Sequence, residues 1–277
     1  MHCRCSLALI ALAATTIAML ADGRAQDLTK YPDFMSQWYR TGGIQWDPSK
    51  PIGLPQKPPL TPEYQAIFEA SVADQAIGGQ GNDVHFTCIP HGMPRVMTAT
   101  FPFEIVLKPG VTYILFENQP NRRIWTDGRK FIDSAEPVFN GYSIGRWIDE
   151  DGDGKFDVLE AETRNMKGPR TLETSGLPLH RDNETVVHER IYLDKADKDL
   201  LHDDVTTIDK AFVRPWTISK SYRRVKNPIW YENNCNEHNV HVVIGRENYF
   251  MSADGYLMPA RKDQPPPDLR YFNPARR

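Results

Sequence analysis

The acidic stretch from Asp149 to Glu160 has the residue types and spacing of a calcium-binding loop, D-x-[DN]-x-[DN]-G-x5-E, at every defined position. Calcium prefers about six to eight hard oxygen ligands, which such a loop supplies from carboxylates, a backbone carbonyl and a bound water. We therefore expect Ca2+, or another hard divalent ion, to be held by Asp149, Asp151, Asp153, Lys155, Asp157 and Glu160.

The residues before this stretch do not favour a helix. Residues 141–147 contain two glycines and several β-forming residues, so the helix-loop-helix frame of the usual calcium site is not expected. The alternative is a β-hairpin whose Asp and Gly residues form a solvated turn.

A second group of candidate residues is His180-Arg181-Asp182-Asn183-Glu184. A histidine oriented by a carboxylate is the usual general base, because its pKa lies near neutrality. Leu177-Pro178-Leu179 precedes the group and indicates a buried entry to a loop. We therefore expect His180, with Asp182, at the mouth of a β structure; the alternative is an exposed polar turn.

His85 is a third candidate acid or base. It begins a segment rich in Pro and Gly that ends at Arg95, and such a rigid segment is suited to lining a pocket. In the alternative interpretation the segment is a crossover fastened by a disulfide from Cys88.

The pattern Cys235-x2-His238-x2-His241 contains ligand types that suit zinc or copper. In an extended segment Cys235 and His241 would lie roughly 20 Å apart, and His238 would point to the opposite face. A transition-metal site is therefore not expected here.

Arg122, Arg123 and Arg129 flank the turn Asp127-Gly128. Guanidinium groups bind anionic substrates well, but arginines at strand ends more often form ion pairs with charges of opposite sign. The sequence contains no H-E-x-x-H, phosphate-binding glycine loop or dinucleotide fingerprint, so zincins, kinases and Rossmann oxidoreductases are disfavoured.

The N-terminus has the pattern of an export signal. An apolar run from Ser6 to Leu20 is followed by Gly23-Arg24-Ala25, a small-x-small cleavage site. We expect residues 1–25 to be a signal peptide, removed on transfer to the periplasm or the medium, with no membrane span left afterwards; the alternative is an uncleaved membrane anchor.

Cleavage of the signal would leave Cys88 and Cys235 as the two cysteines of the mature chain. In an oxidising compartment such a pair is expected to form a disulfide. Free thiols and shared metal ligation are the alternatives.

Size and charge limit the remaining possibilities. About 250 residues would remain, enough for one large β-rich domain over 26–277, with an irregular arm over 26–60 and an extended Pro-rich tail over 263–277. The net charge is −3, with both signs interspersed, so nucleic acid is not an expected partner. Oligomeric state is left open.

Most of the domain is expected to consist of short strands. Thr61-Pro62-Glu63 predicts the start of a helix that runs to about Gln75. Alternating segments then predict many strands, among them a hairpin of 103–107 with 111–116. The predicted fold is mainly β: a single antiparallel meander, either barrel-like (lipocalin-like) or a sandwich, with one N-terminal helix.

Four segments resemble a family of uncharacterised exported proteins of soil bacteria: Cys88 to Arg95, Arg122 to Arg129, Gly141 to Gly145 and Arg214 to Thr217. The resemblance covers most of the mature chain and implies export, but no activity. Many members of that family have a short Trp-x-Gly-Asp turn in place of the acidic stretch.

We expect an exported barrel that takes a small, partly apolar or aromatic molecule into a pocket. Acid-base chemistry of a lyase, isomerase or hydrolase would use His180, Asp182 or His85. The alternative is an envelope accessory protein stabilised by calcium and a disulfide, without catalysis.

Overall fold

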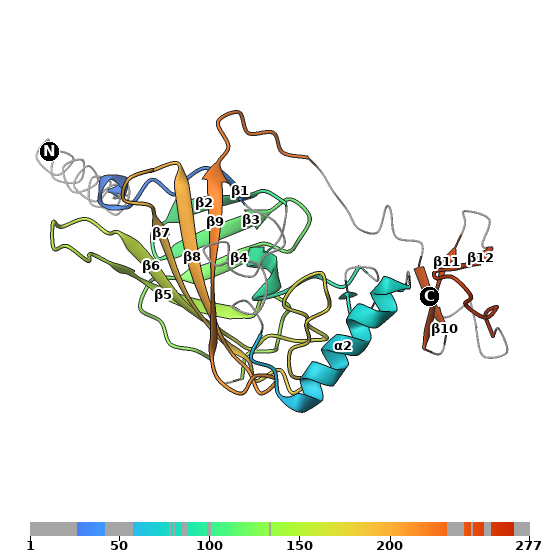
Figure 1. The fold of residues 1–277 in the computed structure, drawn as a ribbon. Helices are drawn as coiled ribbons and strands as arrows, with labels where there is room; N and C mark the ends of the chain where they lie inside the picture. The colour runs from blue at the N-terminus through green and yellow to red at the C-terminus, as the bar shows by residue number, and fades with distance from the viewer. Residues whose placement is uncertain are drawn as a thin grey trace, which may run out of the picture.

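The chain folds around a closed barrel of nine strands, seen in the computed structural model (Figure 1). The structure describes residues 27–41, 58–77, 79, 81–84, 88–98, 101–132, 134–231, 241–244, 246–251 and 256–268. The barrel strands are β1 (Gln37–Arg40), β2 (Phe103–Lys108), β3 (Val111–Phe116), β4 (Arg122–Trp125), β5 (Tyr142–Ile148), β6 (Val158–Arg164), β7 (Val186–Leu193), β8 (Leu200–Ile208) and β9 (Trp216–Arg224). The predicted mainly β, barrel-like fold is confirmed.

Neighbouring strands of the barrel are antiparallel, except β4 and β5, which run parallel. β1 pairs with both β2 and β9 and thereby closes the ring. The fold therefore differs from a purely antiparallel meander at one place. Residues 126–141 connect β4 to β5, and a connection of about a dozen residues or more is what parallel pairing requires.

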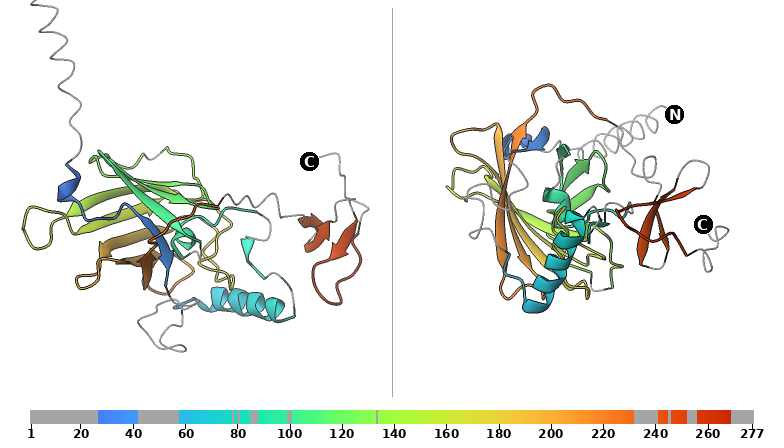
Figure 2. Two further views of the ribbon diagram at one scale, coloured as in Figure 1. Left: turned by 90° about the horizontal axis from the view of Figure 1, so that it is seen from above. Right: turned by 45° about the vertical axis from the view of Figure 1, so that its right-hand side comes forward.

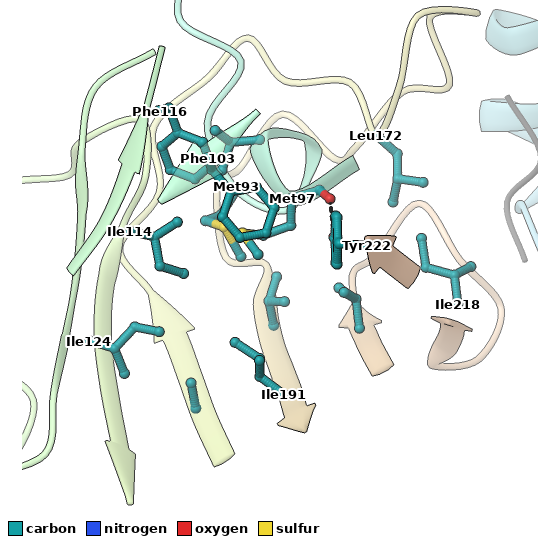
Figure 3. Packing of buried hydrophobic residues seen from close by; sticks show 14 of the residues in the cluster. Met93, Met97, Phe103, Ile114, Phe116, Ile124, Leu172, Ile191, Ile218 and Tyr222 are labelled. Carbon is teal, nitrogen blue, oxygen red and sulfur yellow. Dashed lines mark hydrogen bonds between the residues drawn. The ribbon is translucent and has the colours of Figure 1, made fainter. Parts of the chain in front are cut away.

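A cluster of buried apolar side chains packs inside the barrel (Figure 3). Ile114, Ile191 and Tyr222 come from three different strands, and Met93 and Met97 pack against them from the segment around the 3-10 helix η4 (Arg95–Thr98). Burying a large apolar side chain contributes about 1.5 to 3 kcal/mol. The part of the barrel interior that Figure 3 shows is therefore packed with side chains of the barrel's own buried cluster.

The helix α2 (Pro62–Ala76) lies alongside the barrel, near one end (Figures 1 and 2). The Thr61 side chain caps it by accepting a hydrogen bond from Tyr64 N–H at 3.4 Å, as the sequence predicts. The Thr61 N–H donates to Ala211 O at 2.8 Å, which fixes the start of the helix to the connection between β8 and β9. A short 3-10 helix, η1 (Leu28–Lys30), precedes β1.

A second, three-stranded antiparallel sheet follows the barrel, formed by β10 (His241–Ile244), β11 (Glu247–Met251) and β12 (Leu257–Pro259). Arg261 ties this part to the helix and to its own sheet, because its guanidinium lies 3.2 Å from Asp74 Oδ1 and 2.8 Å from Glu247 Oε1. Among the helices that the structure describes, none is both long and apolar enough to span a membrane.

Candidate functional site

The acidic stretch forms the turn of a β-hairpin. β5 and β6 pair as far as Ile148 and Val158, and the stretch connects them. Asp149 accepts hydrogen bonds from the N–H groups of Gly152, at 2.7 Å, and Gly154, at 2.9 Å. The acidic stretch is therefore the turn of a β-hairpin, as the alternative interpretation predicts.

This turn meets the requirements of a calcium site only in part. Three carboxylates lie within 4.8 Å of one another, those of Asp149, Asp151 and Asp153. Glu160 lies on β6, and its carboxylate accepts hydrogen bonds from Arg146 Nη2 at 2.8 Å and Arg190 Nη1 at 3.2 Å. Two ion pairs would have to break before Glu160 could serve as the bidentate ligand.

Lys155 and Asp157 belong to the hydrogen bonds of the same turn. Lys155 N–H donates to Asp153 Oδ1 at 2.8 Å, and Asp157 Oδ2 accepts from Glu150 N–H at 2.9 Å. A cation would compete with these N–H groups for the carboxylates. Calcium binding by the six residues stays a prediction.

His180 lies in the connection between β6 and β7 and is held by its backbone and its ring. Its N–H donates to Asp209 Oδ1 at 2.9 Å, and its ring lies 5.4 Å from the ring of Tyr64 on α2. The Nδ1 atom is 2.9 Å from Asp182 Oδ1, and the side chain is 25% exposed. The predicted pairing of His180 with Asp182 is therefore present.

The surroundings of Asp182 determine which nitrogen of His180 carries the proton. Burial raises the pKa of Asp182, but hydrogen bonds from Lys210, the Glu184 N–H and His180 outweigh it and hold that pKa well below its usual range. An ionised carboxylate only accepts hydrogen bonds, so Nδ1 carries the hydrogen at this contact. The longer alternative, in which Asp182 N–H donates to Nδ1 at 3.3 Å, is weaker. Nε2 therefore keeps the lone pair of a base.

His180 lines a cavity of about 550 Å³, a volume within the usual range for ligand pockets. We call it the His180 cavity. It is open to solvent on one side and is bounded by α2, by Asn82 and Val84, and by the β6–β7 connection; its lining includes Tyr64, Ile67, Asn82, Arg170, His180 and Arg181. Side-chain hydrogen bonds join its walls, because Ser71 Oγ donates to Ser175 O at 3.1 Å and Gln75 Nε2 donates to Thr174 O at 3.1 Å.

Arg170 is a residue of this cavity that the sequence does not reveal. It is 5% exposed; its Nη2 donates to Thr185 Oγ1 at 2.7 Å and its Nε donates to Asn183 Oδ1 at 3.4 Å. Its Nη1 has no hydrogen-bond partner among the described residues. Neighbouring residues in the sequence give no sign that this arginine is buried.

Two of the three arginines around the Asp127-Gly128 turn form ion pairs. Arg122 forms a buried, two-pronged ion pair with Glu189, with Nη1 2.8 Å from Oε1. Arg129 pairs with Asp127 at 2.6 Å. Arg122 and Arg129 are therefore paired with carboxylates, as the alternative interpretation predicts.

Ser143 lies in a G-x-S-x-G sequence, the spacing of a hydrolase nucleophile elbow. An elbow requires an exposed serine on a turn between a strand and a helix, whereas Ser143 lies within β5 and is 1% exposed. Its Oγ accepts from Arg122 Nε at 3.1 Å and lies 2.8 Å from Thr163 Oγ1. Ser143 therefore supports the barrel interior and is no nucleophile.

A larger depression, about 870 Å³, crosses the outer face of β5 to β9. Two of its carboxylates already have partners: Glu160 pairs with two arginines, and Asp204 accepts hydrogen bonds from Ser219 Oγ at 2.5 Å and from Tyr192 OH at 3.2 Å. The His180 cavity, whose lining includes a histidine oriented by a carboxylate and the buried Arg170, is the better candidate site.

Several predicted residues lie outside the part of the chain that the structure describes. They are His85, Cys235, His238 and the signal peptide over 1–25. Cys88 is described, but the pairing of Cys88 with Cys235 stays a prediction.

Comparison of the chain with protein-family models, with curated proteins and with solved structures finds no match. The resemblance to exported proteins of soil bacteria is therefore still an expectation.

Proposed function

We propose that this protein is exported and binds a small, partly apolar molecule in the His180 cavity, where His180 transfers a proton. The observation that carries the proposal is the His180–Asp182 pair, with a 2.9 Å contact, in the wall of a cavity of about 550 Å³. The pocket lies outside the barrel, between α2 and the β6–β7 connection.

His180 acts as the base and Asp182 orients it. Asp182 stays ionised because Lys210 Nζ lies 2.7 Å from its Oδ2, so it holds the Nδ1 hydrogen and stabilises the imidazolium that forms when Nε2 takes a proton. Tyr64, Ile67 and Leu179 supply apolar or aromatic contacts to the ligand. Proton abstraction of this kind serves lyase, isomerase and hydrolase reactions alike.

The test is a screen for turnover of small esters, lactones and hydroxy acids, followed by His180→Gln. We expect turnover of the active compound to fall about a hundredfold or more, because general acid-base catalysis contributes at least that much. His188→Gln, on the outer face of β7, is the matched control, and circular dichroism checks that both variants fold.

Equal turnover by His180→Gln and the unmodified protein would end the catalytic assignment. If the cavity only binds its ligand, no compound in the screen would turn over. Ile67→Trp, which fills the cavity, would still abolish binding of the ligand.

A second candidate function is supported by an exposed apolar segment after β9. Ile229, Trp230 and Tyr231 are 60%, 44% and 60% exposed. Consecutive exposed side chains of this size are typical of contact surfaces, in keeping with an envelope accessory protein stabilised by calcium and a disulfide. In that case Trp230→Ser would abolish cross-linking to an envelope partner and leave ligand binding in the His180 cavity unchanged.

A further inference from the structure

The His180 cavity has an excess of positive charge. Two arginines, Arg170 and Arg181, are among its lining residues, against a single acidic residue, Glu63. Arg181 makes no side-chain hydrogen bond or ion pair within the described ranges, and its backbone N–H donates to Tyr64 OH at 3.4 Å. Arg181 is thus a cation that a ligand can reach.

Arg170 adds a buried charge to the same wall. Its hydrogen-bond partners are neutral groups: Thr185 Oγ1, Asn183 Oδ1 and His180 O. Asp209 is linked to it only through the Thr185 hydroxyl, which donates to Asp209 Oδ2. Burial lowers the pKa of Arg170, although Asp209 and Asp182 act in the opposite direction. A buried cation without a directly bound counter-ion strongly favours an anion nearby.

We propose that the molecule bound in the His180 cavity carries a carboxylate, which Arg181 contacts and the charge of Arg170 stabilises. This inference rests on the proposed function, because it names the ligand class of the same cavity. A monoanion matches the net lining charge of one positive unit better than a phosphate dianion does, since His180 is neutral when it acts as a base. The apolar lining beside it accommodates the hydrocarbon part of such an acid.

Pairs of equal size and different charge test the proposal. Acetate, hexanoate and benzoate are compared with acetamide, hexanamide and benzamide by following the NMR signals of the His180 ring in the full chain. We expect at least one acid to shift these signals and to bind about tenfold or more tightly than its amide, as a charge-assisted hydrogen bond allows.

Variants assign the effect to the two arginines. Arg181→Gln, at an exposed position, should remove the preference for the acid without unfolding the protein, and Arg170→Lys should retain part of it because the charge remains. Arg123→Gln, an exposed arginine on β4 outside the cavity lining, is the matched control and should bind as the unmodified protein does.

The outcomes separate this inference from the proposed function. Equal binding of acids and amides, with His180 signals shifting for both, would overturn the carboxylate assignment and leave the ligand cavity in place. If none of the acids shifts the His180 signals at its highest soluble concentration, the carboxylate assignment is also overturned. The His180→Gln turnover measurement then decides whether the proposed function holds.

Discussion

Asp203 is a carboxylic acid inside the barrel. It is 0% exposed, and neither of its oxygens has a hydrogen-bond partner among the described residues. Burial, and then the charge of Glu189, raise its pKa well above the usual value, while Arg122 acts in the opposite direction. Lys220 stands opposite it in the register of β8 and β9.

This raised pKa predicts how stability depends on pH. Between about pH 4 and the higher pKa of Asp203 in the folded protein, the unfolded chain loses this proton and the folded chain keeps it. The free energy of unfolding should therefore fall as pH rises, by up to about 1.4 kcal/mol for each pH unit.

Asp203→Asn should remove that dependence and give a higher free energy of unfolding at pH 7. Urea unfolding from pH 4 to 8 measures it. Asp33→Asn, at an exposed carboxylate, is the control and should follow the unmodified protein. The same or a steeper fall with pH in Asp203→Asn would mean that Asp203 is ionised in the folded state.

At the scale of elements, the hairpin of β5 and β6 concentrates negative charge at its tip. The carboxylates of Asp149, Asp151 and Asp153 repel one another unless a cation lies between them. We expect weak calcium binding, at about 0.1 to 1 mM, as in extracellular modules.

Calcium should therefore raise the melting temperature, and Asp151→Asn should abolish the increase. Glu136→Gln, another exposed acid, should retain it. Identical melting curves in calcium and in chelator would show that the acidic residues only shape the turn.

Elements with local signals could be predicted from the sequence. The cap at Thr61 and the contact of His180 with Asp182 depend on residues two or three positions apart, and both are present. The partners of Glu160 could not be predicted, because Arg146 and Arg190 approach it only through the register of three strands.

The same reason explains why the cavity was not found in the sequence. Its walls meet through hydrogen bonds between residues about a hundred positions apart, such as Ser71 with Ser175. Arg170 is buried only because those walls come together. The parallel pairing of β4 with β5 likewise has no signature in either strand.

At the scale of the whole molecule, the predicted disulfide would join the connection between β1 and β2 to the segment that follows β9 in the sequence. Closing so long a loop in the unfolded chain could stabilise the fold by about 4 to 5 kcal/mol. Thiol titration of the unfolded, unreduced mature protein should detect no free sulfhydryl, and the reduced protein should show two, from Cys88 and Cys235. Two free thiols before reduction would exclude the bond.

The parallel contact of β4 with β5 has a consequence for the ring as a whole. Each antiparallel neighbour reverses the direction of the chain, so a closed ring can contain only an even number of reversals. Nine strands make nine contacts, of which eight are antiparallel. An odd-numbered ring must therefore include a parallel contact, and the long segment over 126–141 is the piece of chain that satisfies this parity.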